Sequence, residues 1–440
     1  MSQNKKDNKP SSRVPQTSLS RGLKLSGMFG SIAARTALDA TSQLFKAQKP
    51  SLSRALLSDQ NANSIAKRLS EMRGAAMKIG QMISMDAGEF LPESWEPILK
   101  RLREGADLMP KTQLLETLNT HWGNNWDSHF KYFSFEPVAS ASIGQVHKAQ
   151  LKSGQWLAVK VQYPGVVKSI DSDVNNVGRL LRLSGILPKD FDLDSILLEA
   201  KAQLKTEADY EQEAQYIRSF STHLAEDTRF VVPEIYDPLS NKAILCMSFI
   251  EGESLDNVQY RAENERSQII QHLFDLLLNE LFTYGFIQSD PNFANYLYLP
   301  QSRQIALLDF GACKSLPKDL SAHYKLIARG MLEQNRQLCE QGLRSLKLIY
   351  DRMPEVTQNT IIEATLAAGE CLQTSQYNFK SSGLIKRLYA QTETLMRQQR
   401  EIESPNFDVA LVNRKVSGMV LLANKLNCEF ALRERVVKHL

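Results

Sequence analysis

The sequence lacks the features that mark several common protein classes. Its 21 glycines and 16 prolines are too few for a low-complexity or collagen-like chain. Its five cysteines lie far apart and form no C-x-x-C pair, which argues against a disulfide framework or zinc ribbon and favours a reducing compartment. The seven histidines show no H-E-x-x-H or similar spacing, so a transition-metal enzyme is not expected.

Long apolar runs and a strongly basic body are also missing. No segment approaches the roughly 18–20 apolar residues needed to cross a bilayer, so no transmembrane helix is predicted. The net charge of +4 is uneven, because residues 1–54 carry ten Lys and Arg against two Asp. That segment is therefore +8 and the remainder −4. Such a body is not typical of a nucleic-acid binder, and no nucleic-acid partner is expected.

The sequence pattern divides the 440 residues into four parts. Residues 1–54 predict a basic, partly disordered arm, in which residues 23–45 have apolar side chains near helical spacing. This amphipathic helix either lies on an anionic membrane surface or packs on the protein, and the pattern does not choose between the two. Residues 55–130 form a helical extension, residues 131–250 a small lobe, and residues 251–440 a mostly helical lobe. The small lobe is expected to contain an antiparallel sheet, a helical insert (about 165–225) and two further strands within 230–249.

Two acidic motifs in the last part indicate phosphoryl-transfer chemistry. Asp309-Phe-Gly311 follows the apolar run 305–308, and a carboxylate at a strand end can reach Mg²⁺. Asp290 and Asn295 have the spacing of the kinase catalytic loop, in which the Asp handles the acceptor and the Asn holds a second Mg²⁺. We therefore predict Asp290 as a catalytic residue, and Asn295 and Asp309 as metal ligands.

A lysine in the small lobe completes this pattern. Lys160 lies near the end of the predicted strand that starts at Trp156, and its Ala-Val-Lys context resembles the V-A-I-K signature of kinases. Taken alone, Lys160 would be an exposed lysine on an edge strand; its order relative to the other motifs favours contact with nucleotide phosphates. Its partner carboxylate is expected on the following helical segment, where the candidates are Glu207, Glu211 and Glu213.

The loop expected to cover the phosphates has an unusual composition. Protein kinases use G-x-G-x-x-G, in which absent side chains let backbone N–H groups approach the phosphates. Alanines here restrict the backbone, and serine hydroxyls can donate to phosphate oxygens. We predict a stiffer loop and an altered nucleotide pose. The loop residues are Ala139, Ser140, Ala141, Ser142, Ile143, Gly144 and Gln145.

The sequence after Asp309-Phe-Gly311 argues against protein kinase activity. It continues to Pro317 and then enters a segment with helical patterning, 320–332. No A-P-E motif and no long activation segment follow, although protein kinases use that segment to position the acceptor peptide.

Together these motifs resemble the UbiB/aarF-domain atypical kinase family, closest to its mitochondrial-type coenzyme Q biosynthesis branch. Lys78-Ile-Gly-Gln81 matches the family's K-x-G-Q, Ala139–His147 its alanine-rich loop, and Glu207-Ala-Asp209 its E-x-D. The segment Gln288–Asn295 departs from the bacterial H-x-D-P-H-P-G-N form and is closer to the mitochondrial type. The resemblance covers residues of about 60–430.

The resemblance implies an α+β, protein-kinase-like fold of two lobes with a helical N-terminal extension. It selects Glu213 as the partner of Lys160. It also implies that the K-x-G-Q helix folds across the catalytic cleft, with Lys78 and Gln81 near Glu207 and Asp209 in a regulatory role. ATP and Mg²⁺ are the implied cofactors, and the adenine is expected against backbone groups of the segment joining the lobes, near Met247, Ser248 and Ile250.

The function implied is a Mg-ATP-dependent ATPase that supports ubiquinone synthesis. Its expected partners are ATP or ADP, an anionic membrane surface, prenylated quinone precursors and coenzyme Q biosynthesis proteins. A small-molecule or lipid kinase, and a non-catalytic scaffold that binds nucleotide and lipid, are the alternatives. The expected location is the cytoplasm with peripheral membrane association, and the mitochondrial matrix is the alternative. Whether the chain forms a homodimer is left open.

Overall fold

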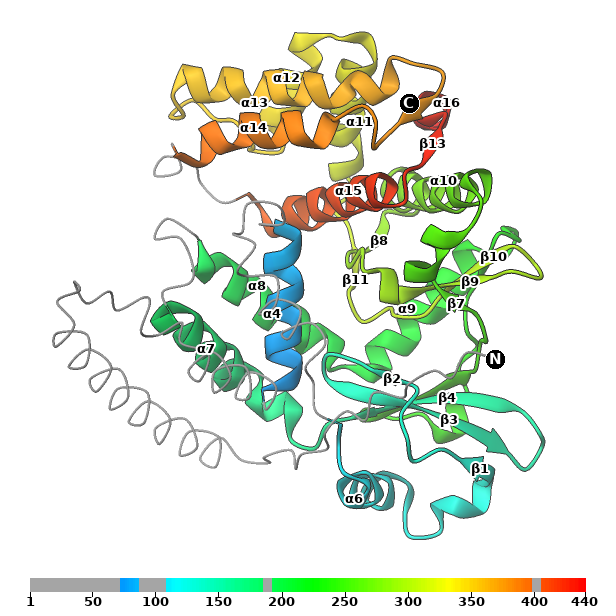
Figure 1. The fold of residues 1–440 in the computed structure, drawn as a ribbon. Coiled ribbons are helices and arrows are strands. Elements are labelled where there is room, and N and C mark those ends of the chain that lie inside the picture. Colours follow the sequence, from blue (N-terminus) through cyan, green and yellow to red (C-terminus); the bar gives the residue numbers. More distant parts are fainter. Residues whose placement is uncertain (1–71, 87–107, 185–191, 398–404) are drawn as a thin grey trace, which may run out of the picture. The chain divides into compact units, whose positions relative to one another are not determined.

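The computed structural model describes residues 72–86, 108–184, 192–397 and 405–440. Within them the chain forms two compact units (Figure 1). Unit 1 contains the residues up to Gln215 together with Glu234–Phe249, and unit 2 contains Tyr216–Pro233 together with Ile250–Leu440. The predicted basic arm, residues 1–54, lies outside the described residues.

Unit 1 is built on an antiparallel sheet with the strand order β1-β3-β4-β6, and β2 pairs with β3. The β3–β4 connection turns at Gly154, which has a φ of 94°, a value that side chains rarely allow. The meander predicted around residues 132–162 is therefore confirmed. The strands are β1 Phe130–Phe133, β2 Ala139–Ser140, β3 Gly144–Leu151, β4 Trp156–Gln162 and β6 Ile244–Ser248.

Alternation along β4 gives the sheet two different faces. Successive side chains of a strand point to opposite faces, so Leu157, Val159 and Val161 share one face and Lys160 and Gln162 the other. The apolar face packs on α6 (Lys111–Trp122) in a core that contains Leu157, Val159 and Val161 with side chains from α6 and β1. Burying each large apolar side chain contributes roughly 1.5–3 kcal/mol.

The described part of unit 1 contains four further helices. They are α4 Arg73–Asp86, α7 Val166–Ser184, α8 Leu193–Glu207 and α9 Tyr210–His223, the last of which continues past Gln215 into unit 2. α4 contacts α7 and α8 (Figure 1). Asp192 begins α8 by accepting a hydrogen bond from the backbone N–H of Ser195 at 3.1 Å, as an N-cap residue does.

Unit 2 contains a mixed sheet with the order β5-β10-β9-β7, and a separate pair β11-β8. The strands are β5 Phe230–Val231, β7 Glu253–Ser254, β8 Phe286–Gln288, β9 Tyr296–Leu299, β10 Gln304–Leu307 and β11 Cys313–Ser315. We expected both strands within 230–249 to belong to the small lobe, and for β5 this was wrong. β5 pairs in parallel with β10, and Ile305 N–H donates to the Arg229 carbonyl at 2.9 Å.

Helices make up most of the rest of unit 2. Phe274, Phe379 and Phe430 form one of its aromatic clusters, with ring centroids 5.2–5.8 Å apart. The helices are α10 Glu263–Asn279, α11 Leu320–Glu333, α12 Arg336–Ser345, α13 Glu355–Ala368, α14 Leu384–Arg397, α15 Phe407–Lys425 and α16 Leu432–Val437, and β12 Tyr377–Asn378 pairs with β13 Glu429–Phe430.

Candidate functional site

Lys160 lies on a central strand of unit 1 and its side chain is buried. β4 has β3 on one side and β6 on the other, and Lys160 is only 5% exposed. It is therefore not an exposed edge residue. Its Nζ contacts both carboxylate oxygens of Glu213, at 2.7 and 2.9 Å. Two short contacts fix the ammonium at one place beside the sheet.

The first turn of α9 explains why Glu213 is the partner. Asp209 accepts a hydrogen bond from the backbone N–H of Gln212 at 3.0 Å, so it caps the helix. Glu211 in the same turn is exposed, whereas Glu213 is buried against the sheet. On a helix, residues two positions apart point in different directions, so only one of the two acidic side chains can face β4.

The predicted loop of residues 139–145 forms a tight hairpin, in which residues 141–143 join β2 to β3. The backbone N–H of Ala141 donates to the Gly144 carbonyl at 2.9 Å. A side chain at Gly144 would lie 2.3 Å from the Val161 carbonyl, so glycine is required there for β3 to approach β4. Gln145 is buried and its side-chain oxygen accepts from the Met109 N–H at 3.1 Å. This contact holds the Gln145 side chain, and with it the start of β3, against Met109 just before α6.

His147 continues that support on β3. Its Nδ1 lies 2.8 Å from the Ser134 carbonyl and its Nε2 lies 2.9 Å from the Gln145 amide nitrogen. Nδ1 therefore carries the proton and Nε2 accepts from Gln145, which is the neutral form. Burial lowers the pKa of His147 to about 4, while the bond to Ser134 acts in the opposite direction.

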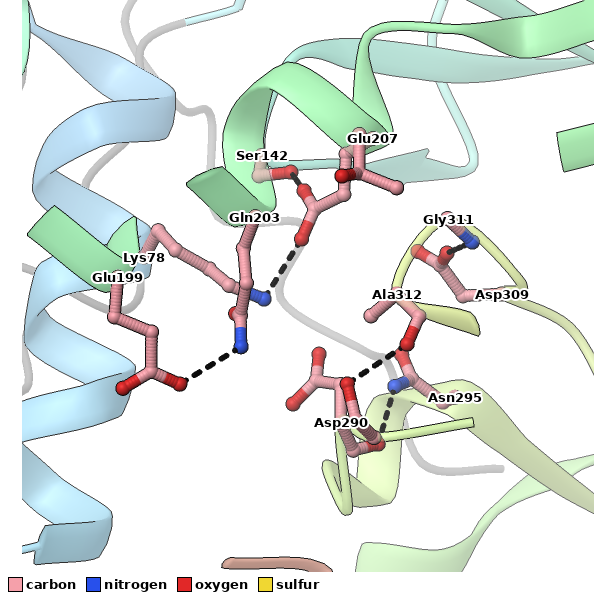
Figure 2. Close-up of polar contacts among 12 residues, drawn as sticks. Lys78, Ser142, Glu199, Gln203, Glu207, Asp290, Asn295, Asp309, Gly311 and Ala312 are labelled. Carbon is pink, nitrogen blue, oxygen red and sulfur yellow. Dashed lines mark hydrogen bonds and ion pairs between the residues drawn. The ribbon is translucent and has the colours of Figure 1, made fainter. Parts of the chain in front are cut away.

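The K-x-G-Q residues lie on α4, which packs directly on this loop. Lys78 Nζ lies 2.7 Å from a carboxylate oxygen of Glu207, and both side chains are buried. Ser142 donates its hydroxyl proton to the same carboxylate (Figure 2). Gln81 is half-buried one turn further along α4. Asp209, predicted near Lys78, serves as the cap of α9 described above.

The predicted adenine-binding residues lie at the end of β6 and just after it. Met247 pairs with Ala158 of β4 and is buried. The backbone N–H of Ser248 donates to the Glu234 carbonyl at 2.8 Å, so this group is already engaged. Ile250 is half-buried and is the first residue of the second segment of unit 2. Their contact with adenine stays a prediction.

In unit 2, backbone contacts bring Asp290, Asn295 and Asp309 into one neighbourhood. The side-chain amide of Asn295 donates to the Asp290 carbonyl at 3.0 Å (Figure 2). The Leu308 N–H donates to the Asn295 carbonyl at 2.9 Å, which places the residue before Asp309 against Asn295. A carboxylate oxygen of Asp309 accepts from the Gly311 N–H at 3.0 Å.

The side chains of Asn295 and Asp309 fit a magnesium ion that takes most of its ligands from phosphate and water. Asn295 and Asp309 carry side-chain oxygens, the ligand type that Mg²⁺ prefers. The amide nitrogen of Asn295 faces the Asp290 carbonyl, so its oxygen faces away from that carbonyl. Among the residues that the structure describes, no group of three His, Cys, Asp or Glu could hold a metal by itself. Mg²⁺ bound with nucleotide needs only one or two protein oxygens.

The sequence did not indicate a buried cluster beside this segment. Lys415 of α15 contacts the side-chain oxygen of Gln288 and the hydroxyl of Tyr296, both at 3.0 Å. Full burial raises the pKa of Glu280, 3.7 Å from Lys415, to about 7. Burial opposes the charge of Lys415, but Glu280 and Tyr296 outweigh it and raise its pKa. A lysine on a helix carries no sequence signal of such a role.

Two expectations about composition can be compared with the described residues. All five cysteines are free and buried, in line with the absence of a disulfide framework. Within the described ranges, no helix is both long and apolar enough to span a bilayer.

Comparison with known proteins places the chain in a family. The ABC1 atypical kinase-like domain matches residues 101–343. The chain is 33% identical over 426 residues to the mitochondrial atypical kinase COQ8 of Saccharomyces cerevisiae, covering 96% of this chain and 84% of that one. It is 32% identical to the mitochondrial atypical kinase COQ8B of Danio rerio, covering 96% of this chain and 68% of that one.

A solved structure shows the same fold. The Mycobacterium tuberculosis protein Rv3197, determined as a complex with erythromycin, is 24% identical and has a TM-score of 0.59, covering 88% of this chain and 97% of that chain. The predicted α+β, protein-kinase-like fold is confirmed, and so is the resemblance based on the motifs. The chain belongs to the ABC1 atypical kinase-like family.

Proposed function

We propose that the chain is a Mg²⁺-dependent ATPase that supports coenzyme Q biosynthesis. It acts on membrane-bound prenylated precursors or on the biosynthetic enzymes rather than phosphorylating proteins. The observation that carries this proposal is the buried pair of Lys160 and Glu213, with contacts of 2.7 and 2.9 Å. Kinases need such a lysine–glutamate pair to bind ATP phosphates productively. The names of the COQ8 relatives support the pathway.

We propose a distinct role for each of these residues. In unit 1, Lys160 neutralises phosphate charge, and Glu213 keeps its ammonium in place. In unit 2, Asn295 and Asp309 would hold Mg²⁺, which would supply further neutralisation of phosphate charge. Asp290 orients or deprotonates the acceptor, which is water or a small lipid-related hydroxyl. Catalysis of this kind depends on positioning and electrostatics.

The chain that follows Gly311 supports an acceptor other than a peptide. β11 begins at Cys313 and α11 begins at Leu320, so the described chain enters a helix eleven residues after Asp309. Protein kinases place a long activation segment at this point to hold the peptide substrate. A short connection leaves a small acceptor as the better fit.

We assign a regulatory role to Lys78, Gln81, Glu207 and Asp209. Glu207 binds both Lys78 of α4 and Ser142 of the loop, so it ties the helix to the loop that is predicted to cover phosphates. Asp209 acts on α9, because it caps this helix, which carries Glu213. In this structure the hydroxyl of Ser142 donates to Glu207 and not to a phosphate oxygen.

ATP hydrolysis by the purified full chain tests the proposal. We expect Mg-ATP turnover, measured with and without anionic liposomes and phenolic compounds, and its loss in Asp309→Asn. Glu213→Gln should lower turnover on the order of 100-fold, because it releases Lys160. Glu211→Gln, an exposed position on the same helix turn, is the matched control and should be unaffected.

The opposite results identify the alternatives. Absence of turnover in the wild type under all these conditions, or full turnover in Asp309→Asn, contradicts the proposal. Transfer of labelled phosphate to a lipid extract indicates a lipid kinase. Nucleotide binding together with full function of every variant indicates a scaffold.

Membrane association of residues 1–54 and the location of the protein stay predictions. Each basic residue near an anionic surface contributes about 1 kcal/mol, and salt screens this attraction. Deleting residues 1–54 should therefore reduce co-sedimentation with anionic liposomes. Unchanged co-sedimentation would remove this part of the proposal.

A further inference from the structure

One ammonium group joins the two ends of the segment 288–296 in unit 2. Lys415 Nζ lies 3.0 Å from the side-chain oxygen of Gln288 and 3.0 Å from the hydroxyl of Tyr296. Gln288 comes two residues before Asp290, and Tyr296 directly follows Asn295. The two contacts therefore bracket both of these predicted site residues. Lys415 itself is only 2% exposed.

The same contact determines the orientation of the Gln288 amide. A lysine ammonium only donates hydrogen bonds, so the amide oxygen of Gln288 must face Lys415. The amide nitrogen then faces the other way and donates to the Asp309 carbonyl at 3.4 Å. Lys415 thus reaches the backbone of Asp309 through one intervening side chain.

Glu280 neutralises the ammonium and contacts the same segment. Its carboxylate lies 3.7 Å from Lys415, is fully buried, and accepts from the Gln288 N–H at 3.4 Å. Glu280 begins the π-helical turn Glu280–Tyr284 at the end of α10. Such turns are frequent at functional sites, because they shift the helix register locally.

Stability alone is a weak reason for this buried pair. Well-packed apolar residues of similar volume are often as stabilising as a buried ion pair. An apolar pair could not, however, hold the oxygens of Gln288 and Tyr296 in fixed directions. The directional contacts favour a role in orienting the segment.

We propose that Lys415 is a positioning residue for the segment 288–296. By holding Gln288 and Tyr296 it fixes the backbone that carries Asp290 and Asn295, and through Gln288 it fixes the carbonyl of Asp309. A test of this proposal by ATP turnover rests on the proposed function. The positioning itself concerns contacts within unit 2 and does not depend on that function.

Paired substitutions separate positioning from stability. Lys415→Met leaves Glu280 without its cation and should lower the unfolding midpoint. The double variant Lys415→Met/Glu280→Gln removes both charges and should recover the midpoint. We expect its kcat to stay on the order of 100-fold below wild type, with the KM for ATP changed less than about twofold. Arg435→Met, which breaks a contact with Asp275 elsewhere in unit 2, is the control and should keep kcat.

A recovery of kcat together with the midpoint in the double variant would overturn the proposal. Hydrogen exchange gives a readout that does not need turnover. Backbone amides of residues 286–296 should exchange faster in the double variant than in the wild type or in Arg435→Met. Unchanged exchange would also overturn the proposal. If the wild type shows no ATP turnover, the proposed function fails, and the exchange experiment still decides the role of Lys415.

Discussion

Gly74 is a point of close approach between α4 and the loop of residues 139–145. A Cβ added at Gly74 would lie 1.6 Å from the backbone oxygen of Ser142. Non-bonded carbon–oxygen contacts lie near 3.3–3.6 Å, so in Gly74→Ala the two backbones must separate by roughly 2 Å. Backbone atoms cannot rotate away as a side chain can, so we expect α4 to move from the loop.

The separation has a calculable effect on the Lys78–Glu207 pair. Their contact is 2.7 Å, and a shift of roughly 2 Å would take it beyond ion-pair distance. Overpacking costs about 1–3 kcal/mol, and the better helix propensity of alanine offsets about 1 kcal/mol of this. Because the lost ion pair adds to the cost, we expect a net destabilisation of about 2 kcal/mol.

Hydrogen exchange of α4, together with ATP binding, is the assay. In Gly74→Ala the amides of α4 should lose protection, and the freed loop should bind ATP about tenfold more tightly if one hydrogen bond to Ser142 is released. Gly178→Ala is the matched control, since its Cβ would first meet the side chain of Leu197, at 2.4 Å, rather than backbone. Wild-type protection of α4 in Gly74→Ala would refute the reasoning.

Three further predictions concern unit 1. Lys160→Met should cost about 3–5 kcal/mol in urea unfolding, because Glu213 is left charged and buried, and Lys160→Met/Glu213→Leu should recover most of it. The pKa of His147 is about 4 in the folded state and 6.5 in the unfolded state, so between pH 6.5 and 4 the unfolded state binds a proton that the folded state does not. The free energy of unfolding should therefore fall by roughly 3 kcal/mol as the pH is lowered from 6.5 to 4. His147→Gln should flatten that dependence in urea titrations. Gly144→Ala should expose amides of β3 to exchange, because its Cβ would lie 2.3 Å from the Val161 carbonyl.

Local patterns made part of the fold and the candidate site predictable. The short apolar run before Lys160 and the order of the motifs pointed to this lysine, and the run depends only on residues close together in the sequence. The catalytic-loop spacing likewise pointed to Asp290 and Asn295. Glu213 needed the family resemblance, because several acidic residues stand within seven positions and only the packing of α9 buries this one against β4.

Pairing between distant segments was not predictable in the same way. β5 has only two residues, Phe230 and Val231, and a strand so short carries no signal of its partner. Its partner β10 lies about seventy residues later in the sequence, and the choice between β6 and β10 depends on tertiary packing. The assignment of β5 to the small lobe failed for this reason.

Lys415 shows a more general limit of sequence patterns. On α15 it stands among polar and apolar residues, and a lysine on a helix is almost always solvated, so the pattern gives no reason to bury it. Its burial is favourable only because Glu280, Gln288 and Tyr296 all present oxygen atoms to it. Those residues come from three other elements, so the requirement for a cation exists only in the folded chain. A buried charge that contacts both ends of one segment therefore tells more about how that segment is held in place than any motif within the segment.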